Sequence, residues 1–166
     1  DTLNAKAALG AIQKIEKVKR TNIPIMISAT ITDLSGRTLS GQTVEGFYNS
    51  VIHSQPISIG LNCALGPKEL EPYLIELNRI SEVFISIHPN AGLPNAFGEY
   101  DETPASMGKF VNEWSRSKYL NIAGGCCGTT PEHIRVMKKS IINQNPRELK
   151  SAEEKLRLSG LEAFNF

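Results

Sequence analysis

Short apolar runs alternate with segments of helical pattern along this chain, and this alternation limits the folds that it can adopt. Four runs are short, apolar and bounded by turn residues, as buried strands are. The predicted strands cover residues 23–30, 57–61, 83–88 and 120–124. Strands that are separated by helices pair in parallel through right-handed crossovers. The sequence therefore predicts an α/β fold with a parallel sheet.

The predicted helices have apolar residues at helical spacing, and three of them begin at or next to a proline. They cover residues 4–19, 43–53, 67–80, 104–117 and 131–142. The longest loops follow strands rather than helices, as in a TIM barrel, whose functional residues gather at the carboxyl ends of the strands. We therefore expect a functional site on the loops after the strands.

Charge and composition restrict the partners of the protein. The 166 residues carry a formal net charge of +1, and the sequence pI is about 7.9, so no basic surface for nucleic acid is expected. No apolar run approaches the roughly 20 residues of a membrane span. The chain has three cysteines, an odd number that argues against a disulfide scaffold and is typical of a reducing compartment. We therefore expect a cytoplasmic protein with no membrane partner.

The three cysteines follow two of the predicted strands. Cys63 lies in the sequence GLNCA, and Cys126 and Cys127 lie side by side in GGCCGTTP. Three thiolates at neighbouring strand ends would form a zinc site with an open fourth position. An open position is typical of catalytic zinc rather than structural zinc. The sequence therefore predicts a catalytic metal centre.

Adjacent residues of a strand point to opposite faces, so the cysteine pair can reach one metal only if the strand ends there. The flanking glycines allow this change of direction. Thr129 or Thr130 would cap a helix that Pro131 begins, and its amino-terminal dipole would favour thiolates. Two alternatives stay open. The cysteines could be small buried apolar residues, or the pair could form a redox disulfide, which would leave Cys63 without a role.

Polar residues after the predicted strands are candidate substrate contacts. Asn90 could offer a displaceable oxygen ligand or a hydrogen bond to substrate, and the alternative is a plain turn role. Asn62 could orient the loop of its neighbouring cysteine, while Ser28 and Thr30 could bind a carboxylate or satisfy local backbone. His88 is a good ligand chemically, but a protein nitrogen would close the fourth position, so we expect a structural role.

Around residues 60–64 and 124–128, the chain resembles the homocysteine S-methyltransferase family. Residues 1–6, 88–95 and 159–162 resemble its cobalamin-dependent members more closely. The resemblance implies a TIM (β/α)8 barrel, represented here by roughly its last four βα units, with Zn²⁺ held by Cys63, Cys126 and Cys127. It also implies a division of the chain. Residues 1–145 would form the carboxyl-terminal half of the barrel, and residues 146–166 a linker and the start of a folate-binding domain.

The resemblance implies methyl transfer to the thiolate of homocysteine, which gives methionine. Methylcobalamin on another module would be the donor, with 5-methyltetrahydrofolate as the methyl source, so the partners would be cobalamin- and folate-binding modules of the same polypeptide. The family's acidic residues for the substrate amino group belong to the other half of the barrel, so we expect an incomplete fragment. The alternatives are a cobalamin-independent homocysteine S-methyltransferase and a structural or redox zinc–thiolate domain.

Overall fold

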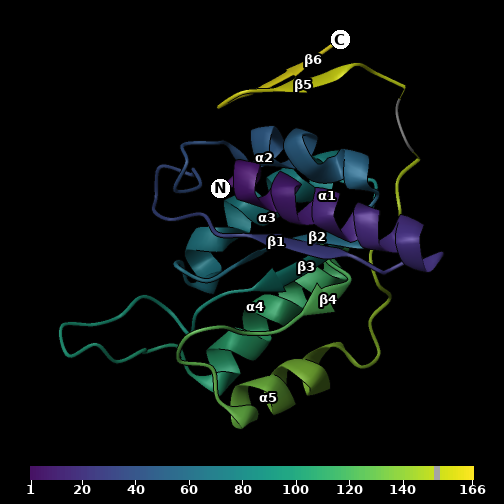
Figure 1. Cartoon of the computed structure of the whole chain (residues 1–166). Helices are drawn as coiled ribbons and strands as arrows, with labels where there is room; N and C mark the ends of the chain where they lie inside the picture. Colours follow the sequence, from purple (N-terminus) through teal and green to yellow (C-terminus); the bar gives the residue numbers. More distant parts are fainter. Residues whose placement is uncertain (152–153) are drawn as a thin grey trace.

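A parallel sheet of four strands, in the order β1-β2-β3-β4, forms the centre of the computed structural model (Figure 1). The structure describes residues 1–151 and 154–166. The strands are Met26–Ala29 (β1), Ser58–Asn62 (β2), Phe84–His88 (β3) and Ile122–Ala123 (β4). Each strand pairs with the next one along the chain, as in part of a TIM barrel. The predicted α/β fold is confirmed, and the described residues form an open sheet rather than a closed barrel.

A helix lies in each connection between the strands of this sheet. These helices are Val44–Val51 (α2), Pro67–Ile80 (α3) and Pro104–Arg116 (α4). Helix α1 (Thr2–Lys19) precedes the sheet, helix α5 (Pro131–Ile141) follows it, and the short 3₁₀ helix η1 (Ile52–Ser54) extends α2. All five predicted α-helices are present. Their starts have the expected chemistry, since Thr43 and Thr103 cap α2 and α4 with their side chains, and prolines begin α3, α4 and α5.

Alternate strand residues divide the sheet into two different faces. Ile59, Leu61, Ile85 and Ile87 are fully buried and belong to the same core cluster as the apolar side chains of α3 and α4. The residues between them are small or polar, such as Gly60 in β2. One face therefore holds the helices, and the other forms the concave side on which a barrel interior would lie.

The segment after α5, predicted as a linker, contacts the body of the protein through Arg147. The Arg147 side chain is buried and donates hydrogen bonds to Asn78 Oδ1 at 2.8 Å, to the Val83 carbonyl at 3.0 Å and to the Ser81 carbonyl. Farther along, strands Arg157–Ser159 (β5) and Ala163–Asn165 (β6) form an antiparallel hairpin. The hairpin lies beside α2 (Figure 1), and the hydroxyl oxygens of Ser50 and Ser159 are 2.7 Å apart.

The predicted linker also includes residues 152–153, which lie outside the described part of the chain. The division into a barrel segment and the start of a second domain stays a prediction. Within residues 1–151 and 154–166, no helix is both long and apolar enough to cross a membrane.

Candidate metal centre

The first cysteine loop turns sharply after β2. Cys63 and Ala64 both have left-handed backbone conformations, with φ angles of 62° and 58°. The Cys63 N–H donates to the His88 carbonyl at 2.9 Å, and the Leu65 N–H donates to the Cys63 carbonyl at 2.7 Å. A left-handed conformation costs roughly 1–2 kcal/mol for a residue with a Cβ. The turn is therefore a costly local structure that fixes the direction of the Cys63 side chain.

The second cysteine loop leaves β4 at the glycines, as the sequence predicts. The Cys126 N–H donates to the Pro89 carbonyl at 2.8 Å, and the Thr129 N–H donates to the Cys126 carbonyl at 3.1 Å. Gly128 follows the pair with a φ of +76°, which glycine adopts without strain. Thr130 is the N-cap of α5 and Pro131 is its first residue. The cysteine pair therefore lies in the turn before a helix start.

The two loops bring the three sulfur atoms together. The Sγ atoms of Cys63 and Cys127 are 3.7 Å apart, those of Cys126 and Cys127 are 4.0 Å apart, and all three lie within 4.8 Å of one another. A tetrahedral zinc ion with Zn–S bonds of about 2.3 Å holds its sulfurs roughly 3.8 Å apart. All three cysteines are free thiols, and Cys127 is exposed. The cluster can therefore hold a metal ion, and its size and sulfur donors are compatible with zinc.

The cysteines differ in acidity because their surroundings differ. A hydrogen bond with the Ala64 backbone N–H lowers the pKa of Cys63. Burial, followed by hydrogen bonding with Cys63, raises the pKa of Cys126 to about 11. The idea that the start of α5 favours a thiolate stays a prediction, and burial acts against the thiolate at Cys126. A metal ion that binds here has to displace the Cys126 proton.

Asn90 connects the two cysteine loops. It is 4% exposed, its backbone N–H donates to the Leu65 carbonyl at 3.0 Å, and its Oδ1 accepts the Cys127 N–H at 3.1 Å. The side-chain oxygen that the sequence offers as a displaceable ligand is thus bonded to backbone.

His88 is half-buried, and burial lowers its pKa. A Cβ on Gly124 would lie 2.4 Å from its ring, so the ring packs closely against the second cysteine loop.

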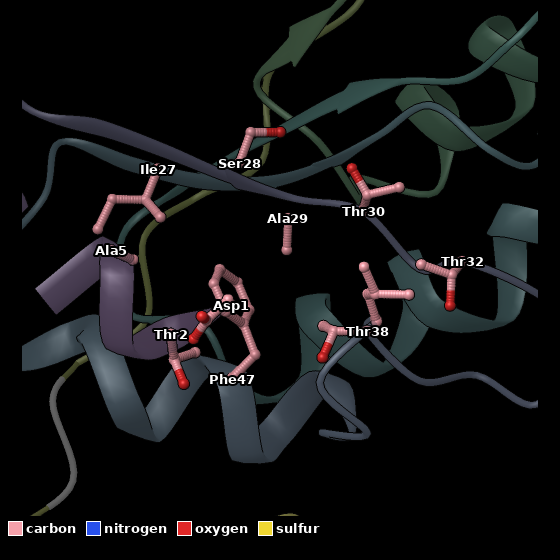
Figure 2. Close-up of a pocket in the computed structure, with 11 residues that line it drawn as sticks. Asp1, Thr2, Ala5, Ile27, Ser28, Ala29, Thr30, Thr32, Thr38 and Phe47 are labelled. Atoms are coloured by element: carbon pink, nitrogen blue, oxygen red, sulfur yellow. The ribbon is translucent and has the colours of Figure 1, made fainter.

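The other predicted contacts lie along β1 and at the end of β2. The Ser28 hydroxyl donates to Asn62 Oδ1 at 2.7 Å, and Asn62 immediately precedes Cys63. Figure 2 shows Ser28 and Thr30 on one side of the chain, while Ala29 points to the other side, toward Phe47. The structure therefore brings Ser28 and Asn62 together next to Cys63.

Ser28 and Thr30 also line a cavity of about 370 Å³ between β1, α1 and α2 (Figure 2). Among the described residues that line this cavity, none is a cysteine. The cavity is therefore separate from the sulfur cluster.

Two residues of the centre have no strong signal in the sequence. Tyr100, from the loop between β3 and α4, lies against the second cysteine loop, and a Cβ on Gly128 would be 2.5 Å from its Cβ and Cγ atoms. His133 is buried, with Nδ1 3.1 Å from the Thr130 nitrogen and Nε2 2.9 Å from the Glu102 carbonyl. Thr130 and His133 have the spacing of a capping box at the start of α5. This spacing is the one feature of the local sequence that indicates a structural role for His133.

One protein-family model matches most of the chain. The model of the family described as homocysteine S-methyltransferase matches residues 1–141. The matched region includes both cysteine loops and all four strands of the parallel sheet. By this match over most of its length, the chain belongs to the homocysteine S-methyltransferase family.

Proposed function

We propose that this chain contributes the zinc site and the homocysteine site of a methyl transfer that produces methionine. The observation that carries this proposal is the gathering of three cysteine sulfurs within 4.8 Å at the ends of parallel strands. Three protein ligands leave a fourth position for the substrate sulfur. Zinc bound there would lower the pKa of the homocysteine thiol, so that the sulfur is a nucleophilic thiolate at neutral pH.

The protein residues around the cluster support the binding and orientation of an amino-acid thiol. Asn90 and the Ser28–Asn62 pair place amide and hydroxyl groups beside the two cysteine loops. Such groups form hydrogen bonds with a carboxylate or an ammonium group. We propose that Asn90, Asn62, Ser28 and Thr30 contact the amino-acid end of homocysteine. Its sulfur would then face the open side of the cluster, where Cys127 is exposed.

We further propose that the methyl donor is methylcobalamin on another module, with 5-methyltetrahydrofolate as the source, as in cobalamin-dependent methionine synthase. Residues 159–162 support this choice, since they resemble the segment that leads into the folate-binding module of that enzyme. The folate- and cobalamin-binding modules of the same polypeptide would then be the partners of this chain.

Calorimetric titration of the zinc-loaded chain with L-homocysteine tests the shared core of these proposals. We expect saturable binding that is lost after removal of zinc with a chelator and in Cys63→Ser. L-homoserine is the matched control ligand, because it differs only in having oxygen in place of sulfur. Equal binding of the two ligands, or undiminished homocysteine binding without zinc, would contradict a role for the cluster in holding the substrate sulfur.

A further inference from the structure

Both backbone groups of Cys127 are bonded to the start of the loop between β3 and α4. The Cys127 N–H donates to Asn90 Oδ1 at 3.1 Å, and the Cys127 carbonyl accepts the Ala91 N–H at 2.8 Å. Asn90 and Ala91 are both buried. The orientation of the Cys127 backbone therefore depends on the position of this part of the loop.

The end of the same loop is joined to its start. The Glu102 N–H donates to the Ala91 carbonyl at 2.9 Å. Gly92, with a φ of +94°, allows the close approach, because a Cβ there would lie 3.0 Å from Glu102 Cγ. Ala91 and Glu102 thus form the base of the β3–α4 loop, beside the second cysteine loop.

His133 joins this base to the first turn of α5. Its side chain is buried, and Nε2 lies 2.9 Å from the Glu102 carbonyl. Because a carbonyl only accepts, Nε2 carries the proton, and Nδ1 is the acceptor for the Thr130 N–H at 3.1 Å. The Thr130 hydroxyl is 2.8 Å from the same nitrogen and can also donate to it. The imidazole is therefore neutral and uses both of its nitrogens.

These hydrogen bonds form a closed circuit around the second cysteine loop. The circuit runs through Cys127, Ala91, Glu102, His133 and Thr130, and the chain itself connects Thr130 back to Cys127. The usual capping-box residue at this helix position is glutamate or glutamine. A glutamate carboxylate could cap the helix, but it could not donate to the Glu102 carbonyl. The second hydrogen bond of His133 therefore goes beyond helix capping.

We propose that His133 is a positioning residue of the cysteine centre, which holds the Cys127 turn in place by joining α5 to the base of the β3–α4 loop. The effect on metal binding rests on the proposed zinc site. Outer partners that orient metal ligands typically contribute about 10–100-fold to metal affinity. His133 thus slows the loss of zinc through the backbone of Cys127, without contacting the metal.

The test compares the parent chain with His133→Asn and His133→Ala. The asparagine keeps an oxygen acceptor in the place of Nδ1, so α5 keeps its cap, but it has no donor in the place of Nε2. The alanine loses both hydrogen bonds. Each zinc-loaded chain is mixed with a chromophoric chelator, and we expect zinc transfer at least about tenfold faster from both variants than from the parent.

Arg147→Ala is the control for general destabilisation. It also removes buried hydrogen bonds, including one of 3.0 Å to the Val83 carbonyl, but these lie next to the start of β3, at the end of the strand away from the cysteine loops. We expect its rate of zinc transfer to stay close to that of the parent. Equal acceleration in His133→Asn and Arg147→Ala would overturn the proposal, because zinc loss would then follow stability alone.

Hydrogen exchange in the metal-free chain gives a second readout that does not depend on zinc. In His133→Asn we expect faster exchange of the Ala91 amide, which bonds to the Cys127 carbonyl, and unchanged exchange of the Thr130 amide, which keeps its acceptor. Unchanged transfer and unchanged Ala91 exchange in both His133 variants would overturn the role of His133 and leave the zinc site intact. A folded parent chain that takes up no metal would overturn the zinc site, and Ala91 exchange would still decide whether His133 holds the Cys127 turn.

Discussion

Backbone conformation at a few residues determines where the sulfurs of the metal centre lie. Cys63 and Ala64 are left-handed although both have a Cβ, and Gly128 is left-handed beneath Tyr100. The strain at Cys63 and Ala64, about 1–3 kcal/mol for each residue, persists only where surrounding contacts enforce it. Here Asn90 and the His88 carbonyl supply those contacts through hydrogen bonds to both cysteine loops. These contacts therefore fix the positions of the cysteine sulfurs that could bind a metal ion.

Replacement of Gly128 by alanine should destabilise the chain by about 2–4 kcal/mol, the sum of a left-handed alanine and a collision with Tyr100. Gly98→Ala is the matched control. Gly98 also has a positive φ, of +78°, but a Cβ there meets nothing within 4 Å, so a loss of only about 1 kcal/mol is expected. Urea denaturation of both variants measures the difference. Equal losses would mean that the Tyr100 contact contributes nothing to stability.

At the scale of helices and strands, the sequence predicts the elements better than their ends. The helices are predicted well because their caps and prolines are local signals. Strand β1 begins at Met26, after Pro24, which has no N–H for a ladder, and β4 has only two residues because the chain turns at Gly124. The β5–β6 hairpin is not predicted, since its position depends on contacts with α2.

At the candidate metal centre too, features set by neighbouring residues in the sequence are predictable, and features set by contacts between distant segments are not. The cysteine pair is predictable because the glycines and the helix start stand beside it in the sequence. Tyr100 and His133 are not predictable in this way, because their roles arise from contacts with Gly128 and Glu102 that only folding creates. Asn90 and Asn62 lie at the cysteine loops and Ser28 is hydrogen-bonded to Asn62, but whether these residues and Thr30 bind homocysteine stays a prediction.

The connection after α5 should depend strongly on Arg147. Its guanidinium donates to two carbonyls and one side-chain amide, so Arg147→Ala leaves buried acceptors without a donor and should cost about 3 kcal/mol. Arg135→Ala is the control on the surface of α5, where the ion pair with Glu132 is exposed and contributes about 0.5 kcal/mol or less. Urea denaturation compares the two. A loss for Arg147→Ala no larger than for Arg135→Ala would show that the buried contacts are not stabilising.

At the scale of the whole molecule, the sheet is open, and its concave face carries exposed apolar side chains. Met26 of β1 and Phe84 of β3 both pair with Ser58 of β2, so the three side chains share one face of the sheet. Met26 is 53% exposed and Phe84 is 43% exposed. Open strand edges and apolar surface promote association. This face is therefore where the isolated chain should contact other molecules.

We expect the isolated chain to self-associate as its concentration rises, and Phe84→Lys to reduce this association by placing a charge on the concave face. Phe97→Lys makes the same chemical change at an 89% exposed residue of the β3–α4 loop and should have no effect. Size-exclusion chromatography with light scattering gives the mass of each variant over a range of concentrations. A parent chain that stays monomeric throughout would contradict this expectation.

The most direct test of the metal centre is the zinc content of the folded chain. Elemental analysis of protein purified under reducing conditions, without added chelator, should give about one zinc per chain. Cys126→Ser should retain far less, because two thiolates cannot replace the three that gather here. Circular dichroism verifies that both proteins are folded. A folded parent chain without zinc would contradict the claim that Cys63, Cys126 and Cys127 form a zinc site in this protein.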